Sequence, residues 1–428
     1  MYFALDIGSS FIKLAMLEND HILLLSKVNT PKALPLQKGI CEIDSAEIFN
    51  AVKKLIDNAI TQCGTDIEGI LISTQMHGLV PRIDGVMGNY ISWQDRRCLE
   101  IMDNSHLSYL QAMQEKVSME QMAHCGVYFK NSMGLCNLFA LLNQNNIAPN
   151  RCEIFSLGSF IINQLSGGNI AHITNAAPIG MVDLVHNCWD ERLFALLGLD
   201  GLKMPAIINA FVPCGRYRGI SVFPDIGDQQ AAILGSGTMQ GDININIGTA
   251  GQISILQDKL CIPPTGTEIR PYFDGKLVCT VTNLPAGRNL EVLINFFSQS
   301  ASLVLGEKIS SEQVWENILD FQMLENTDLR VSLDFFEKGA SIYNINEQNF
   351  TPKQLLFAAY NTMAEEYTKA LQKLNLEKTK RIVFCGGLMQ RIRPLTQLLS
   401  VKLGIPDYAV SNADVFYGLY KLAKGENL

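Results

Sequence analysis

The sequence lacks the features of several protein classes. Its formal net charge is −8, with 34 basic and 42 acidic side chains, and no basic stripe could neutralise a phosphate backbone. No apolar run approaches the roughly 20 residues that a membrane helix needs. The amino terminus lacks the basic and apolar regions of a signal peptide. We therefore expect neither nucleic acid nor a membrane as partner, while a homodimer is compatible with the sequence.

Cysteine pairing is also missing. The chain has 11 cysteines, but none forms a C-x-x-C pair or lies near histidines at a zinc-binding spacing. An odd number argues against a full disulfide framework, so reduced thiols and a cytoplasmic location are expected.

What is present is apolar material for two cores. Hydrophobic residues make up 47% of the 428 residues, and this length favours two domains of about 200 residues each. Residues 201–222 form a connecting region that Pro205 and Pro213 interrupt. We therefore predict domains at residues 1–222 and 223–428.

The amino-terminal pattern predicts an α/β fold. Short apolar runs indicate strands at residues 2–7, 11–17 and 22–28. Asp44 and Glu47 then resemble a capping box at the start of a helix that Gly64 would end. Another strand follows at residues 67–73. Three strands, a helix and a strand form the opening of an actin-like, ribonuclease H-like domain.

A weak internal repeat supports a duplicated fold. Residues 5–13 and 245–253 each combine an apolar strand, a tight turn with glycine and a hydroxyl side chain, and a second strand. The copies lie about half a chain apart, as duplication requires. Two unrelated hairpins with similar turns are the alternative.

Glycine turns of this kind can bind phosphate, because their backbone N–H groups approach the oxygens closely. The candidate nucleotide-binding residues in the two turns are Gly8, Ser9, Ser10, Gly248 and Thr249.

Two charged residues flank the first turn. Asp6 could hold the hydration shell of Mg²⁺. Lys13 could add positive charge near the phosphates, or be an ordinary exposed lysine.

A candidate general base follows the connecting region. Asp228 falls where a helix would begin, so it could cap that helix or accept the proton of an attacking hydroxyl. Asp225 is a rival in a looser segment, and we favour Asp228. The neighbouring Gln229 is expected to contact the acceptor.

Two further segments have side chains suited to a sugar, which is bound through its hydroxyls and an apolar face. The candidates are Gln75, Met76, His77, Trp93, Gln94 and Asp95. Individually, His77 could be a buried structural histidine and Trp93 a core residue. Together the segments predict two walls of one pocket.

As a set, these segments resemble the FGGY family of carbohydrate kinases, in order over nearly the whole chain. The matching segments are residues 6–13, 75–78, 227–231, 246–249 and 385–387. The resemblance implies two actin-like ATPase domains with a ligand cleft between them, ATP and Mg²⁺ as cofactors, and Asp228 as catalytic base. It also implies adenosine contacts from Gly386 and Gly387, and we add Gln390 to the nucleotide-binding candidates.

Within the family, residues 92–98 and 174–177 resemble segments of sedoheptulokinases. That likeness implies phosphorylation of D-sedoheptulose to sedoheptulose 7-phosphate. Xylulokinase or another sugar kinase of the family is the alternative, and a sugar sensor without catalysis is a third interpretation.

Overall fold

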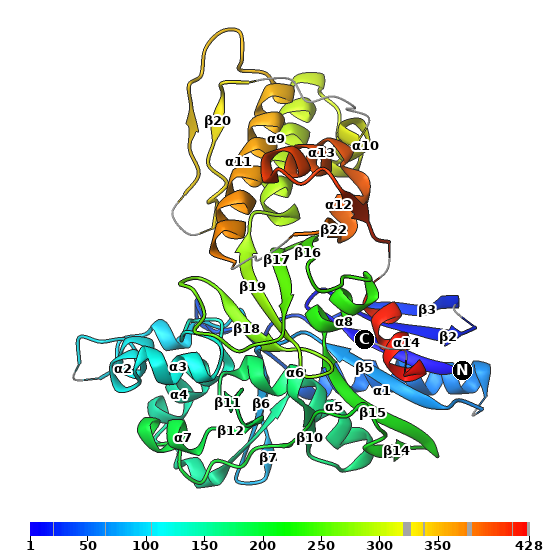
Figure 1. The fold of residues 1–428 in the computed structure, drawn as a ribbon, viewed down its shortest axis with the longest axis vertical. Coiled ribbons are helices and arrows are strands. Elements are labelled where there is room, and N and C mark those ends of the chain that lie inside the picture. Colours follow the sequence, from blue (N-terminus) through cyan, green and yellow to red (C-terminus); the bar gives the residue numbers. More distant parts are fainter. Residues whose placement is uncertain are drawn as a thin grey trace.

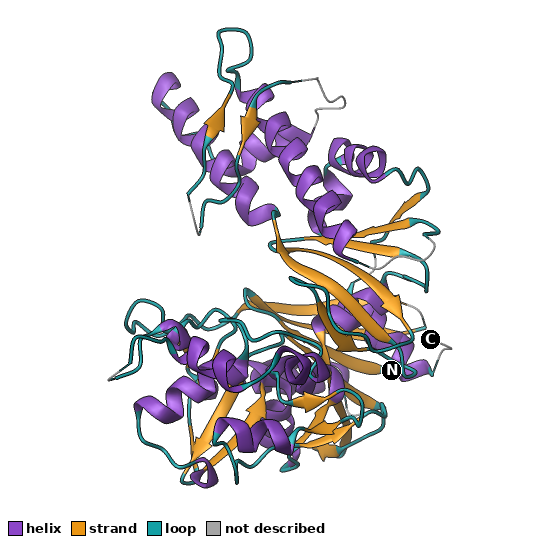
Figure 2. Cartoon of the chain, turned by 60° about the vertical axis from the view of Figure 1, so that its left-hand side comes forward, coloured by secondary structure: helices purple, strands orange, loops and turns teal. Residues whose placement is uncertain are grey.

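The computed structural model describes residues 1–19, 21–64, 66–103, 105–319, 327–336, 339–374, 379–412 and 414–425. These residues form two lobes, each built on a six-stranded mixed sheet (Figures 1 and 2).

The first sheet has the order β14-β15-β5-β1-β2-β3. Its strands are β1 (Tyr2–Ile7), β2 (Phe11–Glu18), β3 (His21–Asn29), β5 (Gly69–Thr74), β14 (Gly215–Tyr217) and β15 (Ile220–Gly227). Strands β1, β2 and β3 are antiparallel, whereas β5 and β15 continue parallel to β1. The strands predicted near the amino terminus are therefore confirmed within one or two residues.

The second sheet has the order β18-β19-β17-β16-β22-β23. Its strands are β16 (Ile243–Ile247), β17 (Gly251–Gln257), β18 (Glu268–Pro271), β19 (Leu277–Leu284), β22 (Ile382–Cys385) and β23 (Tyr408–Val410). Antiparallel β16, β17 and β19 followed by parallel β22 and β23 repeat the pattern of the first sheet. The repeat read from residues 5–13 and 245–253 thus corresponds to a repeated sheet topology.

Helices cover both sheets. The first lobe contains α1 (Ser45–Cys63) and α5 (Leu157–Ser166), and the second contains α9 (Gly287–Leu305), α10 (Ser311–Leu319), α11 (Pro352–Lys373), α12 (Gly387–Arg391) and α13 (Arg393–Leu403). Asp44 caps α1 by accepting from the N–H groups of Ala46 and Glu47, and Gly64 ends it, as predicted.

A smaller antiparallel sheet also belongs to the first lobe. It consists of β4 (Glu42–Ile43), β6 (Leu79–Ile83), β7 (Val86–Met87), β8 (Tyr90–Ile91) and β9 (Cys152–Ser156). Helices α2 (Tyr109–Lys116), α3 (Met119–His124), α4 (Gly134–Gln144) and α7 (Glu191–Leu197) lie on one side of it and share a hydrophobic core with it. Further short elements are β10 (Ile170–His172), α6 (Ile173–Ala176), β11 (Val182–Asp183), β12 (Cys188–Trp189), β13 (Ala206–Ile208), β20 (Arg330–Val331) and β21 (Ile342–Tyr343).

The junction between the lobes is tightly packed. Strand β15 runs directly into α8 (Asp228–Gly235), and α14 (Val415–Lys424) packs against α8 and against β1 and β5. Gly418 is needed there, because a Cβ would lie 3.1 Å or less from the backbone of Ala231. The predicted boundary at residue 222 falls inside β15, and that division remains a prediction.

None of the helices in the described residues is both long and apolar enough to cross a membrane.

Candidate functional site

A cavity of about 420 Å³ lies between the two lobes and collects most of the predicted site residues. Its lining includes Asp6, Gly8, Ser9, Ser10, Lys13, Gln75, Met76, His77, Trp93, Asp228, Gln229, Gly248 and Thr249. The two glycine turns, some 240 residues apart in sequence, therefore face one cavity. We name this the acceptor cavity.

The two turns connect similar strand pairs, with four residues between the paired Ile7 and Ile12 and three between Ile247 and Gly251. Asp6 pairs with Lys13 across the first hairpin, and Gly8 N–H donates to the Phe11 carbonyl at 3.0 Å. In the second, Asn246 pairs with Gln252, and Gly248 N–H donates to the Ala250 carbonyl at 3.1 Å. Each strand pair thus ends in a short turn at the cavity.

The second turn is also joined to a helix. Gly287 N–H donates to the Gly248 carbonyl at 2.9 Å, and Arg288 N–H donates to the Thr249 carbonyl at 3.1 Å. These bonds satisfy two N–H groups at the beginning of α9 and hold that end of the helix directly beside the turn.

Asp228 is the first residue of α8 and lies at the carboxyl end of β15. Its Oδ1 accepts the Gln229 N–H at 2.8 Å. Burial, followed by the negative charge of Asp6, raises its pKa to about 7, against the opposing effects of the Gln229 N–H and Arg270. A carboxylate with that pKa is suited to accept a proton near neutral pH.

Asp225 has a different environment. Its side chain is fully buried, accepts from Ser156 Oγ and from the His172 N–H at 2.9 Å each, and is not part of the cavity lining. It holds α5 and β10 against β15, which is a structural position.

Gln75 supplies an amide without partners at the cavity wall. It is 6% exposed, yet neither Nε2 nor Oε1 has a hydrogen bond within the described protein. An unpaired buried amide costs about 1–3 kcal/mol, so this group is suited to a polar ligand. Trp93 and Met76 add apolar surface to the same lining.

Gln94 and Asp95 lie outside the lining. Asp95 is fully buried and binds Arg97 through two contacts of 2.9 Å, and Gln94 is exposed and accepts from Cys41 Sγ at 3.8 Å. Asp95 therefore supports the loop beside Trp93 rather than facing the acceptor cavity.

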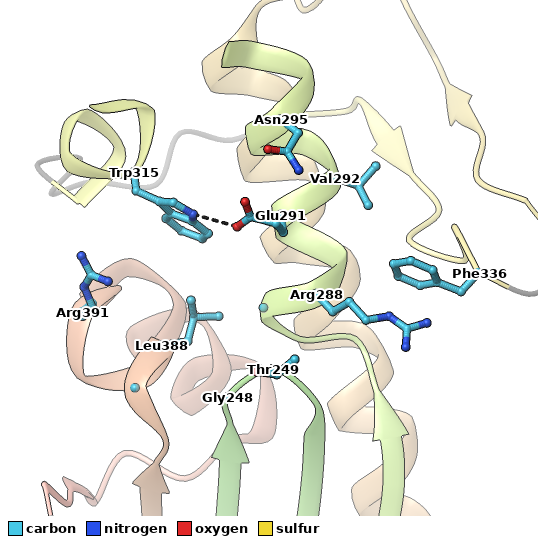
Figure 3. Close-up of a pocket in the computed structure, with 12 residues that line it drawn as sticks. Gly248, Thr249, Arg288, Glu291, Val292, Asn295, Trp315, Phe336, Leu388 and Arg391 are labelled. Atoms are coloured by element: carbon cyan, nitrogen blue, oxygen red, sulfur yellow. Dashed lines mark hydrogen bonds between the residues drawn. The ribbon is translucent and has the colours of Figure 1, made fainter. Parts of the chain in front are cut away.

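A second cavity, of about 790 Å³, adjoins the first and shares Gly248 and Thr249 with it (Figure 3). We name it the nucleoside cavity. Its other lining residues come from α9, α10, α12 and the loop at Phe336: Gly287, Arg288, Glu291, Val292, Asn295, Trp315, Phe336, Gly387, Leu388 and Arg391.

Aromatic and charged side chains frame the nucleoside cavity. Trp315 Nε1 donates to Glu291 Oε2 at 3.0 Å, and the Arg288 guanidinium lies 3.5 Å from the centre of the Phe336 ring. No local pattern in the sequence points to Trp315 or Phe336. Trp315 reaches the site through the packing of α10 on α9, and Phe336 reaches it through the loop after β20.

The predicted adenosine contacts lie at the start of α12. Gly387 lines the nucleoside cavity, whereas Gly386 does not. Gly386 has φ +89°, and a Cβ there would lie 2.6 Å from the Ile247 carbonyl, so it lets β22 approach the second turn. Gln390 is in α12, but its side chain lies outside the described residues.

The Asp6 carboxylate is a suitable ligand for magnesium. The Asp6 carboxylate lines the acceptor cavity and accepts from Lys13 Nζ at 2.9 Å. No cluster of three or more potential metal ligands occurs in the described residues. A single hard oxygen ligand matches Mg²⁺, which keeps several waters and is otherwise bound by substrate phosphates.

Comparisons with curated proteins find distant relatives. An uncharacterized sugar kinase of Archaeoglobus fulgidus is 24% identical over 272 residues, covering 57% of this chain and 54% of that protein. Apulose kinase of Pectobacterium atrosepticum is 27% identical over 298 residues, covering 64% and 58%. The chain thus spans little more than half the length of these relatives.

Solved structures match the whole fold. Xylulose kinase from Lactobacillus acidophilus gives a TM-score of 0.83 at 16% identity, covering 100% of this chain and 90% of that one. Plasmodium falciparum glycerol kinase with ADP gives 0.79 at 18% identity, with 100% and 91% covered. The predicted fold of two actin-like, ribonuclease H-like domains is confirmed.

Residues 1–235 match the N-terminal domain of the FGGY family of carbohydrate kinases, and the match ends with α8. This stretch is more than half of the chain and carries the first turn, the Gln75–His77 wall and Asp228. The protein belongs to the FGGY family of carbohydrate kinases.

Proposed function

We propose that this protein transfers the γ-phosphoryl group of ATP to a hydroxyl of a ketose, with Asp228 as the general base. The observation that carries the proposal is the junction of the two cavities at Gly248 and Thr249, with Asp228 in the acceptor cavity. A nucleotide in one cavity can then direct its triphosphate toward an acceptor in the other.

The nucleotide half of the site uses positioning and charge, which are the main contributions of proteins to phosphoryl transfer. The adenosine moiety would occupy the nucleoside cavity, and the N–H groups of both turns would bind the phosphates. Mg²⁺ near Asp6 would neutralise charge on the transferring group. Lys13 lies beside Asp6 and supplies further positive charge.

The acceptor half presents a base and a partnerless amide. As the sugar oxygen bonds to phosphorus, the bond from phosphorus to the ADP oxygen breaks and the hydroxyl proton passes to Asp228. Gln75, whose Nε2 and Oε1 have no hydrogen bond among the described residues, would hold a second sugar hydroxyl. Trp93 would cover an apolar face of the sugar.

The substrate class is a ketose, and D-sedoheptulose, phosphorylated at C7, is our first candidate. It rests on the segments at residues 92–98 and 174–177. In the second segment, Asn175 Nδ2 donates to Thr74 Oγ1 at 3.0 Å, at the end of the strand that precedes Gln75. D-xylulose is the alternative substrate, since the structural neighbours include xylulose kinases.

A kinetic screen tests the proposal. Phosphoryl transfer from Mg-ATP would be measured with sedoheptulose, xylulose, ribulose, gluconate and glycerol, and the acceptors would be compared by kcat/KM. We expect a ketose to exceed gluconate and glycerol by at least about 100-fold. Saturable sugar binding without ADP formation would instead indicate a sensor. A cytoplasmic location and a homodimer remain predictions.

A further inference from the structure

Arg270 occupies the centre of the interface between the lobes. It lies on β18 of the second sheet, is 5% exposed and lines the acceptor cavity. Its guanidinium contacts three side chains from different elements: Glu268 on its own strand, Gln229 on α8, and His77 after β5. A planar group with five donors can serve three partners at once, which a lysine ammonium on one nitrogen does less well.

The Glu268 carboxylate, which pairs with Arg270, also binds a second cation. Arg270 Nε donates to Glu268 Oε2 at 3.1 Å, while Lys130 donates to Oε1 of the same carboxylate, and Thr282 Oγ1 donates there at 3.0 Å. These cations keep the pKa of Glu268 well below its usual value, despite burial. Two cations on one anion leave the cluster with a net positive charge next to the cavity.

His77 has both ring nitrogens engaged. Nδ1 lies 2.9 Å from the Pro178 carbonyl, which can only accept, so Nδ1 carries the proton. Nε2 is therefore the acceptor for Arg270 Nη2 at 2.8 Å. Burial, and then the charge of Arg270, lower the pKa of His77 to about 3. His77 is thus a neutral ring in one tautomer, fixed by a residue of the opposite lobe.

Gln229 links Arg270 to the base. Its Oε1 accepts from Arg270 Nη1, and its Nε2 donates to Ser254 Oγ at 3.2 Å and Thr280 Oγ1 at 3.0 Å. Its backbone N–H meanwhile donates to Asp228 Oδ1. Gln230 Nε2 also donates to the Pro271 carbonyl of β18 at 3.1 Å. The start of α8 is therefore attached to the second sheet through two glutamines, of which Gln229 contacts Arg270.

We propose that Arg270 is a positioning residue for phosphoryl transfer. It aligns His77, in the wall of the acceptor cavity, with Asp228 at the start of α8. This proposal rests on the proposed function. The charged groups that influence Asp228 are Asp6 of β1, which raises its pKa, and Arg270, which lowers it. Lys13 of β2 pairs with Asp6, and the Tyr90 phenol on β8 also interacts with Asp228.

Kinetics of two substitutions test the alignment. Arg270→Met removes the contacts and the charge, so we expect kcat to fall about 100-fold, with KM for ATP within about threefold. In the pH profile of kcat/KM, the fall on the acidic side (the acid limb) should move to higher pH, because Arg270 lowers the pKa of Asp228. Arg270→Lys should restore the position of that limb while recovering only part of kcat. Arg82→Met is the matched control, because Arg82 also pairs with a strand glutamate but lies outside both cavities.

A measurement without turnover separates this proposal from the proposed function. In NMR spectra of the ligand-free protein, the His77 signal, identified by its loss in His77→Gln, should not titrate between about pH 5 and 8. In Arg270→Met it should titrate at higher pH than in the wild type. The positioning role is overturned if the His77 signal of Arg270→Met titrates as in the wild type. It is also overturned if the pH profile of kcat/KM is the same in both proteins and only the thermal stability of the variant falls. A wild-type chain that phosphorylates no acceptor would overturn the proposed function, while the His77 signal still decides whether Arg270 holds that wall.

Discussion

The two hairpins that face the acceptor cavity have the same strand arrangement, with a loop one residue shorter in the second, and they differ in charge. In the first, the residues paired across the strands are Asp6 and Lys13; in the second, the equivalent pair is Asn246 and Gln252. Both turns offer glycine and hydroxyl residues, but only the first brings ionised side chains. The comparison indicates that the hairpin occurs in both sheets, whereas the charged side chains at the cavity belong to the first one. In the proposed mechanism, both turns would bind phosphate and the first alone would supply charge to the metal and the base.

The largest expected effect comes from the carboxylate between the hairpins. Asp228→Asn should reduce kcat by about 10³-fold or more, since general base catalysis contributes 10²–10⁴-fold. Sugar affinity measured by calorimetry should stay within about threefold. Near-normal turnover of this variant would remove Asp228 as the base and leave the two turns as a binding device only.

Exchanging the charges of the hairpins tests the comparison directly. Asp6→Asn should lower kcat by about 30-fold and weaken the apparent affinity for Mg²⁺. Asn246→Asp should instead raise KM for ATP by about tenfold, because a new carboxylate would face the phosphates. The two variants are compared in Mg²⁺ and ATP titrations. Equal effects on both titrations would contradict the division of roles.

The pH dependence of kcat/KM tests whether Asp6 of the first hairpin acts on Asp228. The carboxylate of Asp228 must be ionised to accept a proton, so kcat/KM should rise as pH increases through about 7. Asp6 raises that pKa, so Asp6→Asn should move the limb to lower pH, opposite to the shift expected for Arg270→Met. A limb at the same pH in both variants would show that another group controls the profile.

The thermal stability of Asp228→Asn tests the raised pKa of Asp228 without an activity measurement. A carboxyl whose pKa is raised by folding destabilises the folded protein when ionised, and this penalty shrinks as pH falls through the folded pKa. Asp228→Asn should therefore have a higher Tm than the wild type at pH 8, and the difference should decrease at pH 5. If the Tm difference between the variant and the wild type is the same at pH 8 and pH 5, burial does not raise the pKa of Asp228.

The smallest effects concern the turn glycines. Gly386→Ala places a side chain against the Ile247 carbonyl at positive φ and should cost about 1–3 kcal/mol in the free energy of unfolding. At Gly248 a Cβ meets nothing within 4 Å, so Gly248→Ala should change stability by less than about 0.5 kcal/mol. Denaturant unfolding of both variants tests whether only the supporting glycine is required by the fold.

The parts of the molecule that depend on local sequence were predictable. Alternating apolar residues specify β1 to β3, and Asp44 and Gly64 delimit α1 because capping acts within a few residues. The turns at Gly8 and Gly248 were also recognisable, because each places a glycine and a hydroxyl residue between two apolar strands.

Residues recruited by tertiary packing were not predictable in the same way. Arg270 and Lys130 meet at Glu268 although 140 residues separate them in sequence. Trp315 reaches Glu291 only because α10 packs on α9. Asp95 looked like a sugar ligand, but its pairing with Arg97 was hidden in the adjacent motif. The site assignments themselves remain predictions.

Strand β15 limits how this protein can be recombined. It crosses residue 222, completes the parallel part of the first sheet beside β5, and ends one residue before Asp228. A chimera joined at residue 222 would build a single strand from two parents and place the join six residues from the base. Exchange of first lobes between relatives should instead be made after Gly235, and it should include a matching α14, because that helix packs against α8 from the other end of the chain.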